Sequence, residues 1–324
     1  MRKCAFILPY YGTLPNYFQV FLNTCATNPD FDWLLFTDDH TAYDYPDNVH
    51  VHYETFSDMQ ERAKRCFDFP ICLKQPYKLC DYKPTYGLLF SDYLQDYAFW
   101  GHCDCDVVFG RLGHFITDDL LSSYDKLFMQ GHCTLYRNNE RVNKAFMLPL
   151  EGEEVYRRVL SSHQAFTFDE SYLPLNINRI FAEHGFRLFT ADLSANTYSK
   201  SDTFRLLHYD AALATYLIEE PNRAVYVWDD GVLSRSYFRL GRFTTVELMY
   251  MHLQRRRMKV DDRILKMKRF KILPGFFEPL EVESVTKENF RSIRWKRFTT
   301  HGLQLMRGDM RFWKKRVSSK LFHL

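Results

Sequence analysis

The sequence predicts an α/β fold built on a mostly parallel sheet that is flanked by helices. Short apolar stretches rich in β-branched and aromatic residues alternate with stretches of helical pattern along the first half of the chain. Several of the apolar stretches end in polar or glycine-containing loops, as strands do. In a parallel sheet these loops gather at the carboxyl ends of the strands, where ligands bind.

The elements follow one another in an order that supports this prediction. In the first half we expect strands at 3–8, 33–37, 49–53, 107–109 and 126–129, and helices at 16–26, 56–67, 86–97, 115–123 and 138–146. Further along we expect helices at 155–162 and 175–184, and strands at 224–228 and 244–253. The chain shows no internal repeat, no P-loop and no Gly-x-Gly-x-x-Gly motif.

Size and composition are those of a globular protein. The 324 residues suffice for one large or two modest domains, and no apolar run reaches the length of a membrane span. The first apolar run is too short for a signal peptide, so we expect a cytoplasmic protein.

The eight cysteines lack Cys-x-x-Cys spacing and are expected to be free, buried thiols. A zinc site from Cys103, Cys105, His132 and Cys133 is the alternative.

Basic residues concentrate near the C-terminal end. Residues 1–252 hold 23 Lys and Arg against 33 Asp and Glu, whereas residues 253–324 hold 20 against 7. Apolar residues three and four apart predict a basic amphipathic helix, through Leu303, Met306, Met310, Trp313, Val317, Leu321 and Leu324. We therefore expect a domain at 1–260 and a basic extension at 261–324 that binds an anionic membrane surface. Packing of the helix on the rest of the protein is the alternative.

Asp104 and Asp106 are the first candidates for a chemical role. An apolar stretch precedes them at 97–100, and a second follows at 107–109 and ends at Gly110. In an extended chain both carboxylates point to the same side, and two like charges there favour a bound cation. Mg²⁺ or Mn²⁺ takes carboxylate oxygens and completes its shell with substrate phosphate. A second Asp-x-Asp copy, Asp30-Phe31-Asp32, is interpreted as a solvated turn.

Other candidate side chains each have a structural alternative. His252 is a candidate third metal ligand, or a core residue of an apolar strand. Asp169 and Glu170 are candidate general bases, or helix caps. Asp229-Asp230-Gly231 is either a turn or part of an acceptor site. Lys83 is placed to reach a phosphate or ribose, or is a solvated lysine at a helix start.

Five segments together carry a resemblance to a known family. They are Asp81-x-Lys83-Pro84, Phe99-Trp100-Gly101-x-x-Asp104-x-Asp106, Gly131-His132-x-Thr134-Leu135-Tyr136-Arg137-Asn138, Phe168-Asp169-Glu170 and Tyr250-Met251-His252-Leu253-Gln254-Arg255-Arg256-x-Met258. This set resembles the GT-A-type glycosyltransferases encoded in bacterial capsule and exopolysaccharide loci, over residues 1–260. The resemblance implies a GT-A-like, Rossmann-like sandwich that binds a nucleotide-diphosphate sugar, with UDP-sugar as the expected donor. It also implies Mn²⁺ or Mg²⁺ held by Asp104, Asp106 and His252.

The expected reaction follows from the resemblance. A sugar is transferred to a saccharide acceptor, expected to be lipid-linked, in surface polysaccharide biosynthesis at the inner face of the cell membrane. The metal stabilises the departing nucleoside diphosphate, and in an inverting enzyme Asp169 or Glu170 removes the acceptor proton. We expect inversion. The expected donor contacts are Pro9, Tyr10, Tyr11, Thr37, Asp38, Lys83 and Asp104.

Two other functions fit parts of the pattern. A sugar nucleotidyltransferase is expected to carry a glycine-rich basic loop after its first strand, and the loop at 9–12 has no basic residue. A non-catalytic module that binds polysaccharide or membrane would leave the Asp104, Asp106 and His252 set unexplained. A nucleic-acid partner is not expected, because no motif for one appears.

Overall fold

The computed structural model describes residues 3–294, apart from 199–202, 211, 214, 221–222 and 255. Two compact units make up the chain. Unit 1 consists of Met1–Val107, Leu112–Asp192 and Tyr209–Tyr216. Unit 2 consists of Val108–Arg111, Leu193–His208 and Leu217–Leu324.

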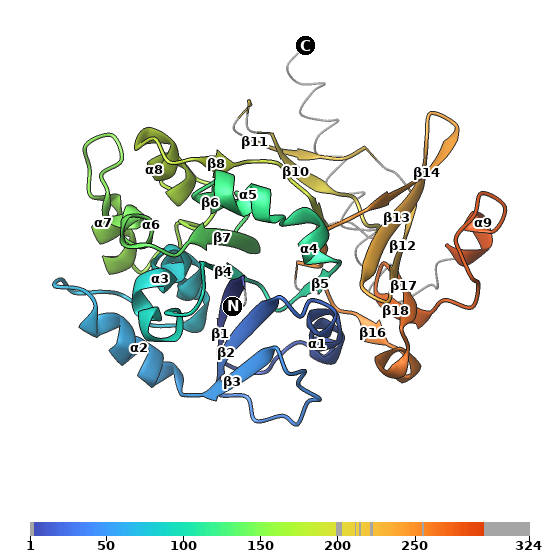
Figure 1. The fold of residues 1–324 in the computed structure, drawn as a ribbon, viewed down its shortest axis with the longest axis horizontal. Coiled ribbons are helices and arrows are strands. Elements are labelled where there is room, and N and C mark those ends of the chain that lie inside the picture. Colours follow the sequence, from blue (N-terminus) through green and yellow to red (C-terminus); the bar gives the residue numbers. More distant parts are fainter. Residues whose placement is uncertain are drawn as a thin grey trace, which may run out of the picture. The chain divides into compact units, whose positions relative to one another are not determined.

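A seven-stranded sheet with the order β3-β2-β1-β4-β7-β6-β8 forms the centre of unit 1 (Figure 1). Its strands are β1 (Cys4–Tyr10), β2 (Phe31–Thr37), β3 (Val49–Tyr53), β4 (Phe99–Cys103), β6 (Lys126–Leu127), β7 (Cys133–Arg137) and β8 (Leu188–Phe189). Within this sheet β7 alone runs against its neighbours. The predicted α/β class with a mostly parallel sheet is therefore confirmed.

One edge of this sheet collects several loops that are distant in the sequence. The carboxyl ends of β1, β2 and β4 lie there, because these strands are parallel. The reversed strand β7 starts at the same edge, since Cys133 pairs with Cys103. Loops 9–12, 37–39, 104–106 and 128–132 thus open on one side of the sheet.

Helices cover both faces of the sheet (Figure 1). Those of unit 1 are α1 (Phe18–Ala26), α2 (Phe56–Arg65), α3 (Tyr86–Leu89), α4 (Leu112–Phe115), α5 (Asp118–Ser123), α6 (Glu140–Asn143), α7 (Val155–Ser161) and α8 (Ile177–Glu183). Short 3₁₀ helices lie at Pro76–Thr85, Ser91–Tyr93 and Ala145–Met147. Thr55 starts α2 with a capping box, in which its side chain and that of Asp58 bond each other's backbone N–H.

The expected helix at 86–97 is wrong beyond Leu89. The Asn138 side chain donates to the carbonyls of Leu94 and Tyr97 at 2.8 and 2.9 Å. The Leu94 carbonyl also accepts from the Tyr97 N–H at 3.1 Å, so this segment forms a turn before β4.

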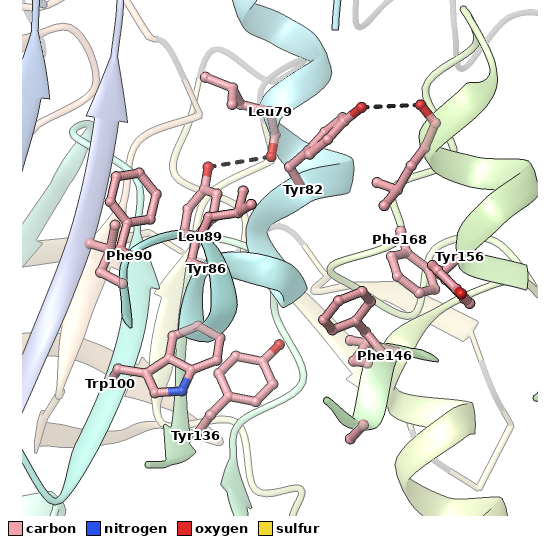
Figure 2. Close-up of a cluster of buried hydrophobic side chains, with 14 of the residues drawn as sticks. Leu79, Tyr82, Tyr86, Leu89, Phe90, Trp100, Tyr136, Phe146, Tyr156 and Phe168 are labelled. Atoms are coloured by element: carbon pink, nitrogen blue, oxygen red, sulfur yellow. Dashed lines mark hydrogen bonds between the residues drawn. The ribbon is translucent and has the colours of Figure 1, made fainter. Parts of the chain in front are cut away.

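A large apolar core lies between the sheet and the helical segments from α2 onward. Figure 2 shows Tyr82 and Tyr86 inside it, with their hydroxyls donating to the carbonyls of Leu160 and Leu79 at 3.0 and 3.4 Å. Trp100 of β4 stacks on Tyr136 of β7 with ring centroids 4.4 Å apart (Figure 2). This packing fixes the 3₁₀ helix that carries Asp81 and Lys83 against the sheet.

Unit 2 contains a six-stranded sheet with the order β14-β13-β12-β17-β18-β16. Its strands are β12 (Ala224–Asp229), β13 (Val232–Arg239), β14 (Arg242–Glu247), β16 (Lys259–Val260), β17 (Arg269–Leu273) and β18 (Phe276–Pro279). A three-stranded sheet has the order β5-β15-β9, from β5 (Val107–Phe109), β9 (Ser194–Asn196) and β15 (Tyr250–His252). The remaining elements are β10 (Leu207–Asp210), β11 (Thr215–Ile218), a 3₁₀ helix at Asp262–Lys266 and α9 (Phe290–Ile293).

The expected continuous strand at 244–253 is wrong, because the chain changes sheets at Met249. The Met249 carbonyl accepts from the Gly110 N–H at 2.8 Å, and the Met249 N–H donates to Leu193 at 3.1 Å. Its backbone groups are therefore satisfied outside the β13–β14 ladder, and β15 begins in the smaller sheet.

The predicted boundary at residue 260 falls within the six-stranded sheet, which contains both β16 and β17. The predicted amphipathic helix from Leu303 to Leu324 lies outside the described residues. In the part of the chain that the structure describes, no helix is both long and apolar enough to cross a membrane.

Candidate active site

Asp104 and Asp106 lie directly after β4, at the sheet edge where the loops open. The Asp104 N–H donates to the His132 carbonyl at 3.1 Å, which ties the loop to the start of β7. The chain turns at Cys105-Asp106 and is not extended there, so the expectation of an extended Asp-x-Asp segment is wrong. The Asp104 side chain is 35% exposed, whereas Asp106 is buried.

His252 completes a cluster of possible metal ligands with the two aspartates. Asp104, Asp106 and His252 each offer one ligand atom, and these atoms lie within 4.8 Å of one another. Asp106 directly precedes β5, and β5 neighbours β15, which ends at His252. This group could hold a metal ion; that the three side chains bind one stays a prediction. Two carboxylates and an imidazole can hold a divalent cation such as Mn²⁺.

Asn196 of β9 orients the His252 ring. Nδ1 of His252 lies 3.0 Å from Oδ1 of Asn196, and the Gln254 amide donates to the same oxygen at 3.0 Å. Because an amide oxygen only accepts, Nδ1 of His252 donates to Asn196, and Nε2 is the ring nitrogen that would bind a metal. A metal-binding histidine commonly has such an oriented ring, so this contact fits the cluster.

Lys83 joins the metal-ligand candidates to the candidate base. Its Nζ lies 2.8 Å from Oδ1 of Asp104, 2.8 Å from the Gly131 carbonyl and 3.1 Å from Oδ2 of Asp169. Burial lowers the pKa of the Lys83 ammonium, but the charges of Asp104 and Asp169 outweigh burial and hold that pKa well above its usual value. Lys83 is therefore a permanent cation between two carboxylates. Its predicted contact with a phosphate or ribose stays a prediction.

Asp169 is a buried carboxyl with a strongly altered acidity. Burial raises its pKa to about 7, and the nearby charges of Glu170 and Asp104 act in the same direction, while Lys83 opposes them. The alternative that Asp169 caps a helix is wrong, because Asn176 caps α8 by accepting from the Arg179 N–H at 3.1 Å. A carboxyl with a pKa near neutrality has the acidity of a general base.

Asp81 holds the loop that presents Asp169. Its carboxylate accepts from the backbone N–H groups of Phe166 and Phe168 at 3.0–3.1 Å, and it pairs with Lys78 at 2.7 Å. The Asp81 and Lys78 side chains are almost fully buried. In the sequence analysis Asp81 appears only as part of a motif, and its role in holding the loop of Asp169 was not predicted. A carboxylate and a lysine three residues apart are common on solvated helices, so their spacing gave no signal.

Glu170 and Tyr216 form a second polar contact beside Asp169. The Tyr216 hydroxyl donates to Oε1 of Gln130 at 2.9 Å and lies 3.4 Å from Oε2 of Glu170. Burial raises the pKa of Tyr216 far above its usual value, and the charge of Glu170 adds to this effect. The hydroxyl therefore stays protonated. Neither Tyr216 nor Gln130 was singled out from the sequence.

The predicted donor-binding residues of β1 and β2 lie side by side. Tyr10 pairs with Thr37, and Pro9 pairs with Phe36. The Gly12 N–H donates to Oδ1 of Asp38 at 2.6 Å, which joins the two loops. The Tyr11 ring is buried, and its hydroxyl donates to Glu54 at 2.6 Å. The structure thus gathers this predicted set at one sheet edge, and its contact with a donor stays a prediction.

Other candidates have structural roles. Asp229 pairs with Arg269 at 2.8 Å and Asp230 with Lys268 at 3.5 Å, in the turn that joins β12 and β13. In the second Asp-x-Asp copy, Asp30 lies in an exposed turn, as predicted. Asp32 lies within β2 and is 1% exposed, so the interpretation as a solvated turn is wrong for Asp32.

The cysteines also have no metal-binding arrangement in the described part of the chain. The eight cysteines are free, as predicted. Among the described residues, Asp104, Asp106 and His252 are the group of at least three His, Cys, Asp or Glu whose ligand atoms converge, and the alternative cysteine and histidine set does not form one.

The chain belongs to a family of unknown function, DUF6625, whose model matches residues 6–281. No curated protein matches the sequence.

Proposed function

We propose that this member of DUF6625 is a divalent-metal-dependent glycosyltransferase with a GT-A-like fold. Its donor is a nucleotide-diphosphate sugar, with UDP-sugar as the first candidate. Its acceptor is a saccharide, carried on a lipid at the inner face of the cell membrane, in bacterial surface polysaccharide synthesis. The observation that carries the proposal is the convergence of Asp104, Asp106 and His252 beside the Lys83–Asp169 ion pair.

The chemistry of the residues supports this function. Asp104, Asp106 and His252 would hold the cation, which supplies positive charge to the diphosphate leaving group. Asp169 takes the proton of the acceptor hydroxyl as its oxygen forms the new bond to C1 of the sugar. The bond between C1 and the phosphate oxygen breaks, and the nucleoside diphosphate leaves with the electron pair. Attack from the face opposite the leaving group inverts the configuration at C1.

Lys83 has a positioning role in this scheme. It contacts Asp104 and Asp169 at once, so it sets the distance between the metal-ligand cluster and the base. Gly131 leaves space for this arrangement, because a Cβ on it would lie 2.4 Å from Oδ2 of Asp169. The resemblance of the sequence to capsule-locus glycosyltransferases supports the proposal through the same residues.

Asp106→Asn provides the first test, with Asp30→Asn from the second Asp-x-Asp copy as its matched control. Thermal shifts are measured with Mn²⁺ and a panel of nucleotide sugars, because a ligand that binds the native state raises the melting temperature. We expect Asp30→Asn to retain the Mn²⁺-dependent shift and the release of nucleoside diphosphate, and Asp106→Asn to lose both while keeping its fold. An Asp106→Asn protein with the native response would refute the metal assignment.

A further inference from the structure

The turn between β13 and β14 exposes an apolar side chain where the backbone favours a polar one. Leu240 is 97% exposed. Arg239 pairs with Arg242, so the loop consists of Leu240 and Gly241, with φ of +48° and +78°. Two-residue hairpin loops with positive φ at both positions strongly favour Asn-Gly. Neither packing nor turn geometry therefore explains the leucine.

The two arginines beside Leu240 also oppose hairpin stability. Arg239 and Arg242 are both exposed and lie directly opposite each other across the strands. Like charges at such positions repel. Among the described residues neither guanidinium forms an ion pair with a carboxylate. Both charges thus stay available to an anionic partner.

Further arginines lie at the base of the hairpin. Phe238 and Phe243 pack on Phe290 of α9, with ring centroids 5.4 and 5.8 Å apart, which fixes α9 against the hairpin. Arg291 and Arg294 lie in and just after this helix. Burial and the charges of Arg223 and Arg291 lower the pKa of Arg294, so these three cations lie near one another. Because successive side chains of a strand point to opposite faces, Arg239 and Arg242 project from the face of the hairpin that is opposite α9. We call Arg239 and Arg242, which flank Leu240, the arginine face.

We propose that Leu240 and the arginine face dock unit 2 on the surface of a lipid bilayer with anionic headgroups. The arginines bind headgroup phosphates, and Leu240 enters the boundary between headgroups and acyl chains. A soluble polyanion would satisfy the arginines but would leave Leu240 in water. The exposed leucine therefore favours a bilayer. This docking surface is separate from the predicted helix at Leu303 to Leu324, and it does not depend on the proposed enzyme activity.

Co-sedimentation of the full chain tests the proposal, with vesicles of phosphatidylcholine alone or mixed with phosphatidylglycerol. We expect the native protein to bind the anionic vesicles preferentially. Arg239→Glu with Arg242→Glu should weaken that binding at least about tenfold, since each basic residue near an anionic surface contributes about 1 kcal/mol. Leu240→Asn should weaken binding about tenfold through the loss of apolar burial. Its melting temperature should stay equal or rise, because Asn suits positive φ.

Matched variants separate the docking surface from general effects. Leu213→Asn changes another leucine in a hairpin turn, 65% exposed, and Arg65→Glu with Lys74→Glu reverses two exposed charges in unit 1. Both controls should bind as the native protein does. Native binding by the Leu240 and arginine variants, or equal losses in the controls, would overturn the proposal. So would binding of heparin without binding of anionic vesicles, which would assign the arginine face to a soluble polyanion.

A tryptophan at the tip reports on insertion directly. Leu240→Trp should show a blue-shifted emission on anionic vesicles and quenching by brominated lipids, relative to the native protein with its five tryptophans. Leu213→Trp serves as the control and should show neither. An unchanged Leu240→Trp spectrum on vesicles that the protein binds would contradict docking through this turn.

Discussion

Asp169 is the residue whose protonation controls the proposed reaction. A general base acts when deprotonated, and the pKa of Asp169 is raised to about 7. We therefore expect kcat to rise with pH through about 7 and then to level off. Asp169→Asn should lower kcat by about 10²–10⁴-fold and leave donor binding nearly intact. Glu170→Gln should keep the rate at high pH and move its rise to lower pH, because the charge of Glu170 helps to raise the pKa of Asp169. The reverse pattern, with the rate lost in Glu170→Gln and kept in Asp169→Asn, would identify Glu170 as the base.

The pH dependence of the melting temperature tests the raised pKa of Asp169 without an activity assay. Its pKa is higher in the folded protein than the ordinary value of 3.8, so the folded state binds more protons between about pH 4 and pH 7. The stabilisation is complete below this window and is lost as the pH rises to about 7. Asp169→Asn should therefore remove this part of the pH dependence of the melting temperature. An unchanged slope would show that Asp169 titrates normally.

Single residues were predictable from the sequence where a local pattern marks their place. Asp104 and Asp106 follow an apolar stretch and precede another, so the sequence alone places them at a strand end. Asp32 has the same motif, but its carboxylate accepts from the hydroxyl of Tyr97, 65 residues away, at 2.6 Å. Contacts between distant residues leave no local pattern. The Tyr216–Gln130 contact was missed for the same reason.

At the scale of elements, the loop that carries Asp169 depends on a buried ion pair. Asp81→Asn removes the partner of the buried Lys78 ammonium, so we expect the free energy of unfolding to fall by about 3–5 kcal/mol. Chemical denaturation measures the change. Lys78→Met together with Asp81→Asn removes both charges and should cost less than Asp81→Asn alone. A larger loss in the double variant would contradict the role of Lys78 as the partner of Asp81.

The elements that were predicted well have a strong hydrophobic pattern, and nearby residues in the sequence mark where they begin and end. Strands β1, β2 and β3 and helix α2 follow such patterns, and Thr55 marks the start of α2. The turn between α3 and β4 and the division between β14 and β15 depend instead on Asn138 and Gly110, which bind backbone groups far along the chain. These positions could therefore be located only in the structure.

At the scale of the whole molecule, two features are proposed to bind an anionic membrane surface. One is the arginine face with Leu240, and the other is the predicted basic helix, which lies outside the described residues. If both bind one anionic bilayer without touching each other, their contributions to the binding free energy should add. Lys314→Glu with Lys315→Glu should then weaken vesicle binding by a similar factor in the native chain and in the Arg239→Glu, Arg242→Glu background.

The comparison of these four proteins by co-sedimentation separates the two predictions. Raising the salt concentration should weaken the binding of each, because exposed charges are screened. If the Lys314→Glu, Lys315→Glu protein binds as the native chain does, the predicted membrane helix is contradicted and the proposal for the arginine face is unaffected. A tail variant that abolishes binding while the arginine variants bind normally would instead assign membrane attachment to the tail alone. Equal factors in both backgrounds would show that the chain meets the bilayer at two independent places.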